Sequence, residues 1–243
     1  MPTVKENIIA QLQKDILPLQ GYKPAMNNIV VDIELGPIKE AFPNSIFPSG
    51  AIHEFICPTA EGAAASGGFI AGILSSLMRS RGACLWISSS RTIFPPALQS
   101  FGIEPDKIIF IDLQKEKEIL WTMEEALKCD GLAAVVGEIQ ELSFMVSRRL
   151  QLAVEQSRVT GFIIRRGSRH LNTTACVSRW KVSSIPSALT DDMPGVGFPG
   201  WNIELLKIRN GKPGSWSMEW AEGKFRSIYS FASIMEERQK KTG

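Results

Sequence analysis

Short apolar runs alternate with amphipathic stretches through the middle of the chain, from Ser49 to Arg165. The apolar runs predict strands, and the stretches whose apolar residues recur every three or four positions predict helices. The expected strands cover residues 51–57, 83–88, 107–112, 132–137 and 160–165, and the expected helices cover about 66–80, 94–101, 115–128 and 142–157. Runs such as Ala83–Ile87 are apolar at every position, which suits strands buried on both faces. The pattern therefore predicts an α/β fold, in which helices flank a parallel sheet.

The pattern changes after residue 160. Strand-like segments at 175–183, 202–209 and 215–220 follow one another without intervening helices, and a stretch rich in Gly, Pro and Asp separates the first two. These segments predict an antiparallel extension at one edge of the sheet. We expect the core to end at residue 221 and residues 222–243 to form a C-terminal tail.

An amphipathic helix is expected near the N-terminus, at residues 4–16. Its apolar face consists of Ile8, Ile9, Leu12 and Ile16. A proline-rich connector with at most a small helix near 38–42 follows, so the helix and connector make up residues 1–46 and the core spans 47–221. The apolar face of the helix must be buried somewhere. Its residues are therefore candidates for contact with a partner, and docking on the chain's own core is the alternative.

The composition is that of an ordinary globular protein. Of 243 residues, 44% are apolar and 21% are charged, and a net charge of +2 does not by itself favour binding to nucleic acids or membranes. No apolar signal region and no apolar run of membrane-spanning length is present, so a cytoplasmic location is expected. The four cysteines form no C-x-x-C pair and only two histidines occur. This pattern predicts buried free thiols and no metal site.

The stretch between strand 51–57 and the next helix is laid out like a nucleotide-binding P-loop without its chemistry. The residues of this degenerate phosphate loop are Thr59, Glu61, Gly62, Ala63, Ala64, Gly67 and Gly68. If Gly62 is the last glycine of G-x-x-x-x-G-K-[ST], the next two positions are Ala63 and Ala64; if Gly67 is, they are Gly68 and Phe69. Either alignment lacks the lysine that neutralises phosphates and the hydroxyl that holds magnesium. The loop therefore predicts no ATP hydrolysis and no bound cofactor.

A basic segment follows the last predicted parallel strand. No Asp or Glu occurs from Gln156 to Thr190, whereas six cations do. Arg165, Arg166 and Arg169 are expected on a loop suited to phosphate contacts, and Arg179 of the strand-like segment 175–183 is a further candidate. They are candidates for weak DNA binding, and the alternative is a solvated loop whose charges pair with acidic residues elsewhere.

Trp121 lies in the predicted helix 115–128 but outside its expected core face. Leu120, Met123, Ala126 and Leu127 have the spacing of that face. Trp121 is therefore either packed into the core or an anchor for a partner protein, because tryptophan is enriched among the residues that dominate interfaces.

Taken together, several motifs resemble the ImuA family of bacterial mutagenesis cassettes. The resemblance runs from about Phe47 to Trp220. Its motifs are Pro48–Glu54, Glu61–Ala65, Leu120–Leu127, Ala133–Glu138, Ser147–Ala153, Val159–Gly161, Ser178–Trp180 and Pro213–Trp216. Their order and spacing carry the resemblance, since no single motif is diagnostic.

The resemblance implies a RecA-like fold with a degraded ATP site. It implies a non-catalytic role in translesion synthesis, beside an ImuB-like inactive Y-family polymerase homologue and an error-prone replicative-type polymerase, with RecA as a further candidate partner. In RecA-like ATPases a glutamate at the end of the second strand activates water, whereas here Ser88–Arg91 occupy that place. Glu138 is at most a displaced substitute for the aspartate that holds magnesium.

Two other functions remain open at this stage. One is a RecA-like ATPase or recombinase, which the missing lysine argues against. The other is a SulA-type inhibitor of cell division, a RecA-like protein that also lacks a working ATP site and binds the division protein FtsZ. Co-purification with a Y-family polymerase homologue or with FtsZ would distinguish this class from the ImuA family.

Overall fold

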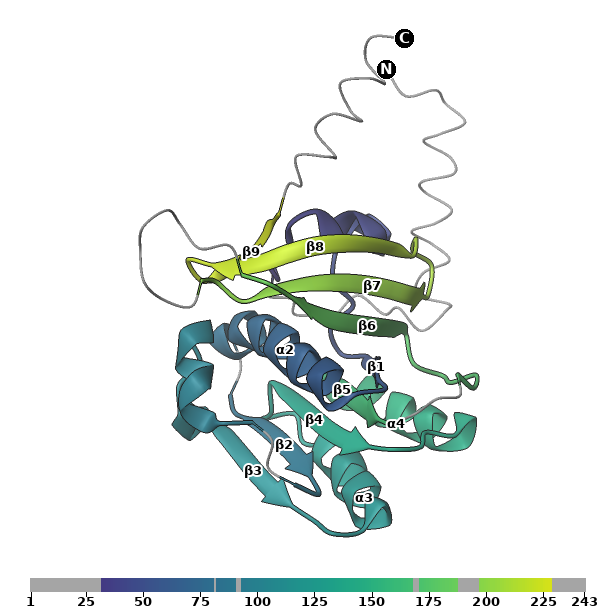
Figure 1. Ribbon diagram of the computed structural model, residues 1–243. Coiled ribbons are helices and arrows are strands. Elements are labelled where there is room, and N and C mark those ends of the chain that lie inside the picture. The colour runs from purple at the N-terminus through teal and green to yellow at the C-terminus, as the bar shows by residue number, and fades with distance from the viewer. Residues whose placement is uncertain (1–31, 81, 91–92, 168–170, 188–196, 229–243) are drawn as a thin grey trace, which may run out of the picture. The chain divides into compact units, whose positions relative to one another are not determined.

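The computed structural model describes residues 32–80, 82–90, 93–167, 171–187 and 197–228. Within these residues nine strands form one sheet, in the order β3-β2-β4-β5-β1-β6-β7-β8-β9 (Figure 1). The strands are β1 (Ile52–Cys57), β2 (Cys84–Ser88), β3 (Ile108–Asp112), β4 (Ala134–Ile139), β5 (Thr160–Arg166), β6 (Ser178–Ile185), β7 (Gly200–Ile208), β8 (Gly214–Ala221) and β9 (Lys224–Ser227). The predicted succession of strands is confirmed.

The sheet is parallel in its first part and antiparallel in its second. β1 to β5 pair in parallel, and β6 continues them by pairing in parallel with β1. β6, β7, β8 and β9 then pair antiparallel, with an irregularity between Arg179 and Trp180 on β6. The predicted antiparallel extension is therefore present, and β6 joins it to the parallel strands.

Helices cover both faces of the parallel strands. The helices are α2 (Ala60–Ser80), α3 (Glu116–Leu127) and α4 (Phe144–Ser157), and short 3-10 segments are η1 (Gly36–Ala41), η2 (Pro43–Ser45), η3 (Pro95–Phe101) and η4 (Pro105–Lys107). α2 lies on one face, between the parallel strands and β6 to β8, and α3 and α4 lie on the other (Figure 1). Side chains alternate along a strand, so Ile163 packs with α3 and α4 while Phe162 and Ile164 face α2.

An aromatic core joins α2 to the antiparallel strands. Phe69 of α2 lies 5.7 Å from the ring of Trp180 on β6 and 5.0 Å from that of Phe225 on β9. Gly72 makes this close approach possible, since a Cβ atom there would lie 2.4 Å from the Phe225 ring. Glycine is otherwise unfavourable inside a helix, so tight packing accounts for its position.

Three predicted boundaries differ from the structure. α2 begins at Ala60 rather than at about residue 66. Residues 95–101, expected as an α-helix, form a 3-10 helix with proline at its start. β9 lies within the predicted tail and pairs with β8.

The compact fold also begins before the predicted core. Leu35 and Ile38 belong to the predicted connector but are fully buried. The 3-10 helix η1 that carries Ile38 contacts β8 and β9. The predicted N-terminal helix lies outside the described residues.

Candidate functional site at the carboxyl ends of the parallel strands

Only Pro58 and Thr59 separate β1 from α2. The Thr59 hydroxyl oxygen accepts a hydrogen bond from the Gly62 N–H at 3.1 Å, and the Thr59 carbonyl accepts one from the Ala63 N–H at 3.1 Å. Thr59 therefore caps the helix. In a P-loop, backbone N–H groups in this region point at phosphates from an open loop. Here the N–H groups of Gly62 and Ala63 are instead bonded to Thr59.

The predicted phosphate loop is thus wrong in its backbone conformation. Its members after Thr59 all lie in α2: Glu61, Gly62, Ala63, Ala64, Gly67 and Gly68. The carboxylate of Glu61 accepts a hydrogen bond from the hydroxyl of Ser184 on β6. A carboxylate in the first turn interacts favourably with the helix dipole, and it places negative charge where phosphate binding requires positive charge.

Glu138 is held by donors from two neighbouring strands. Its side chain is 5% exposed on β4, where Oε1 accepts a hydrogen bond from the Trp86 indole N–H of β2 at 2.9 Å. Oε2 accepts one from the Arg166 guanidinium of β5 at 3.1 Å. Arg166 also donates to the Ser90 hydroxyl at 3.4 Å. Both oxygens of the Glu138 carboxylate are therefore hydrogen-bonded within the protein.

Two cavities of about 320 Å³ each meet at the Glu138–Arg166 pair. The polar one is lined by Ser89, Ser90, Gln114, Glu116 and Gln140, among others. The charged side chains that line it are two carboxylates, Glu116 and Glu138, and one guanidinium group, Arg166. This balance disfavours a triphosphate, which needs several positive charges.

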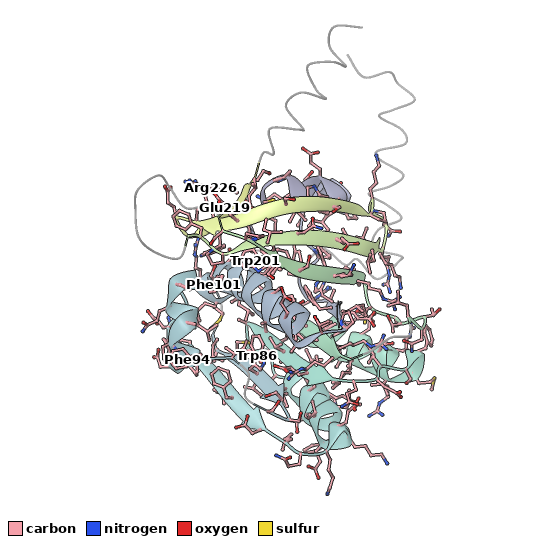
Figure 2. All side chains as sticks on the ribbon, in the orientation of Figure 1. Trp86, Phe94, Phe101, Trp201, Glu219 and Arg226 are labelled. Carbon is pink, nitrogen blue, oxygen red and sulfur yellow. The ribbon has the colours of Figure 1, made fainter. Side chains whose placement is uncertain are left out.

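The second cavity is an apolar slot beside α2. One wall consists of small residues of α2, including Ala63, Ala64, Gly67 and Gly68. Trp86, Phe94 and Phe101, labelled in Figure 2, also line the slot. Its volume lies at the low end of the range for small-molecule sites. The residues predicted to cradle phosphates thus line an apolar surface.

Glu54 on β1 organises a second charged centre, on the α4 face of the sheet. It is fully buried, and its Oε1 accepts from Arg165 at 2.7 Å while its Oε2 accepts from Arg179 at 2.8 Å and from the Thr174 hydroxyl at 2.9 Å. Arg165 donates further to the Asn172 side chain at 2.9 Å. This cluster ties β1, β5 and β6 together.

The structure corrects the predicted DNA contacts. Arg165 lies on β5 rather than on a loop and its side chain is 3% exposed, so its prediction as a phosphate contact is wrong. The Arg179 side chain is 12% exposed and bound to Glu54. Arg166 is 31% exposed and bound to Glu138. All three are paired with acidic residues elsewhere, as the alternative expected, but they lie on strands rather than on a solvated loop. Arg169 lies outside the described residues.

The partner candidates separate into two groups. Trp121 is 64% exposed on α3, so its interpretation as a core residue is wrong and it is available for contact. The four apolar residues of the predicted N-terminal helix, Ile8, Ile9, Leu12 and Ile16, lie outside the described residues.

The cysteines and His53 form no metal site within the described residues. Cys57, Cys84 and Cys176 are buried free thiols as predicted, whereas Cys129 is exposed. Burial raises the pKa of Cys57 to about 11 and that of Cys176 to about 12. His53 is fully buried, and burial lowers its pKa to about 3.

The parallel strand order, the helix that follows β1 and the antiparallel extension give the architecture of a RecA-like α/β protein. A solved structure titled as the RadB recombinase matches with a TM-score of 0.56, at 14% identity, over 82% of this chain and 100% of that chain. This likeness concerns the fold. None of the helices in the described part of the chain combines the length and apolar character needed to cross a bilayer.

Sequence comparison then identifies the family. The chain is 31% identical, over 197 residues, to Protein ImuA from two strains of Caulobacter vibrioides, covering 76% of this chain and 81% of each relative. No family model matches the chain. The chain belongs to the ImuA family.

Proposed function

We propose that this protein is a non-catalytic accessory protein of DNA-damage tolerance and induced mutagenesis. Membership of the ImuA family supports the cellular role. One structural observation supports the absence of catalysis: Glu138, the carboxylate that β4 presents near its carboxyl end, is bonded to Arg166 and Trp86. A carboxylate already satisfied by an internal cation and an indole N–H is a poor ligand for a metal–nucleotide complex.

In this role the protein acts as a scaffold in translesion synthesis. Its partners are an ImuB-like inactive Y-family polymerase homologue and an error-prone replicative-type polymerase, and RecA is a further candidate. Catalysis belongs to the polymerase, and any DNA contact is weak. The exposed Trp121 supports protein contacts as the main activity.

The test is reconstitution of the full-length chain with the two polymerase proteins of the same cassette. A stable complex on gel filtration supports the proposal. Absence of any complex, or magnesium-dependent ATP hydrolysis above a matched blank, contradicts it.

A SulA-type inhibitor of cell division is the second candidate, because that class also combines a RecA-like fold with a missing ATP site. A parallel binding assay with FtsZ distinguishes the two, since an inhibitor binds FtsZ and leaves the polymerase proteins unbound. A RecA-like ATPase or recombinase is the third, and the Glu61 carboxylate in the first turn of α2 argues against it.

A further inference from the structure

The apolar slot beside α2 is open because the residues of its helical wall are very small. Ala63 and Ala64 line it with one methyl group each, and Gly67 lines it with none. A Cβ atom at Gly67 would already lie 3.2 Å from the Ile93 side chain and 4.0 Å from the ring of Trp86. Larger residues on this wall would therefore fill the slot, whereas the present ones leave about 320 Å³ free.

Three aromatic side chains line the slot as well (Figure 2). Trp86 is 1% exposed on β2 and Phe101 is 9% exposed at the end of η3, so the core holds both rings in place. Phe94, just before η3, is 69% exposed, so a ligand that covers this ring removes it from water. Aromatic rings gain from stacked and edge-on contacts with one another. The lining therefore favours an aromatic ligand over an aliphatic one.

The polar part of the lining is the ion pair of Glu138 and Arg166. Nη1 of Arg166 makes both the bond to Glu138 and the bond to Ser90, so Nε and Nη2 donate to no described residue. Both oxygens of Glu138 already accept hydrogen bonds. The pair thus offers donors to a ligand but no net charge. A neutral ligand with a hydrogen-bond acceptor suits it, because a charge of either sign is attracted by one member and repelled by the other.

The volume of the slot limits the size of the ligand. A water molecule takes up about 30 Å³ in the liquid, so the slot has the volume of roughly ten waters. Sites for small molecules begin at about 300 Å³. Two fused rings with one short polar substituent are a ligand of suitable size, and a nucleoside triphosphate is too large and too highly charged.

We propose that the slot binds a neutral, planar aromatic molecule of about two fused rings that carries a hydrogen-bond acceptor. The rings lie between the small residues of α2 and the aromatic side chains, and the acceptor takes a hydrogen bond from Arg166. This inference goes beyond the proposed function and is independent of it, because binding of such a ligand requires no partner protein.

The experiment titrates the full-length chain with 6-propionyl-2-(dimethylamino)naphthalene, a neutral two-ring ketone whose fluorescence shifts to the blue in an apolar site. A saturable blue shift with a Kd on the order of 10 μM is expected for a ligand of this size. Three competitors then test the ligand chemistry. The ketone 2-acetylnaphthalene should displace the probe best. The hydrocarbon 2-ethylnaphthalene lacks the acceptor and should compete about fivefold less well. The anion 2-naphthoate should compete at least about tenfold less well.

Variants test the location. Ala64→Trp should weaken binding of the probe at least about tenfold, because Ala64 is exposed toward the slot and the added ring occupies it. Phe94→Ala removes the exposed ring and should weaken binding about fivefold. Gln156→Trp is the matched control, since it adds the same side chain at an exposed position of α4, on the other face of the sheet. It should bind the probe within about twofold of the wild type. Thermal melting shows which variants are folded, and Phe94→Ala decides the question if Ala64→Trp does not fold.

Several results would overturn the inference. They are the absence of a saturable blue shift in the wild type, equal binding by the wild type and the folded slot variants, and displacement by 2-naphthoate as strong as that by 2-acetylnaphthalene. If the probe does not bind but Ala64→Trp weakens binding of the polymerase homologue, the slot accepts a side chain of that partner, so this inference is wrong and the proposed function stands. Failure to bind either polymerase protein, with the probe still bound, overturns the proposed function alone.

Discussion

Arg165 and Arg166 are consecutive on β5, yet their guanidinium groups lie on opposite faces of the sheet. Arg165 pairs with Glu54 of β1 at 2.7 Å, on the face of α4. Arg166 pairs with Glu138 of β4 at 3.1 Å, on the face of α2. Neighbouring residues on a strand point to opposite sides, so one Arg-Arg dipeptide supplies a buried structural charge and a cavity-lining charge.

The two arginines should differ in their effect on stability. Arg165→Ala leaves the fully buried Glu54 with one arginine fewer and should lower the free energy of unfolding by about 3 kcal/mol. Arg166→Ala removes a partly exposed side chain and leaves Glu138 bonded to the Trp86 N–H beside two cavities that water can enter, so a smaller loss of about 1 kcal/mol is expected. Urea denaturation of the two variants measures the difference. Equal losses would contradict the assignment of Arg165 as structural.

Restoring a lysine should not restore ATP binding. Ala63→Lys and Gly68→Lys each return the missing residue type, but both positions lie within α2 rather than on a phosphate-binding loop. The Gly62 and Ala63 N–H groups also remain bonded to Thr59. We expect neither variant to bind a fluorescent ATP analogue above the wild type. Magnesium-dependent ATP binding gained by either variant would show that the short junction between β1 and α2 does not prevent binding.

Thiol reactivity should single out Cys129. It is exposed, whereas burial raises the pKa of Cys57 to about 11 and that of Cys176 to about 12. At pH 8 a disulfide reagent should therefore modify one thiol in the native protein and all four in denaturant. Cys129→Ser should reduce the native count to zero. A second fast-reacting thiol in the native protein would contradict the burial of the other three.

Stability should fall in mild acid because of His53. Its pKa is lowered from 6.5 to about 3 by burial, so the unfolded chain binds a proton that the folded chain does not. The stabilising effect is present above pH 6.5 and is lost as the pH falls toward 3. Between pH 7.5 and pH 5 the expected loss is about 2 kcal/mol.

Chemical denaturation at these two pH values measures that loss. His53→Gln has no titrating ring, so its free energy of unfolding should change by about 2 kcal/mol less over the same interval. An identical pH dependence in both proteins would show that His53 does not contribute.

The alternation of apolar runs predicted the sheet well because burial on both faces leaves a strong signal. Ala83–Ile87 and Ala133–Val136 are such runs, and they coincide with β2 and β4. The sequence pattern places the start of α2 too late because Gly62 and the spacing of a phosphate loop favour a loop before residue 66. Close packing explains one of the helical glycines: a Cβ on Gly68 would lie 3.1 Å from Trp201. Such long-range contacts are not visible in a local pattern.

The acidic partners of Arg165 and Arg166 also could not be predicted from the sequence, although the positions of the two arginines give one indication. The predicted strand 160–165 ends at Arg165; extended by one residue, it would place Arg165 and Arg166 on opposite sides of the sheet. Glu54 lies opposite Ile163 on the neighbouring strand, but this register follows only from the three-dimensional arrangement. Trp121 lies outside the apolar face predicted for its helix, and its exposure agrees with that position.

The two-residue junction between β1 and α2 has a consequence for how the activity of the protein is regulated. In nucleotide-driven proteins, a segment that is ordered by bound phosphates relaxes after hydrolysis, so the protein alternates between two conformations. Here Thr59 is hydrogen-bonded into the helix that it starts, and no intervening loop remains to rearrange. We therefore expect no conformational switch driven by nucleotide hydrolysis in this protein. The duration of its action would then depend on how much of it is synthesised and how quickly it is degraded.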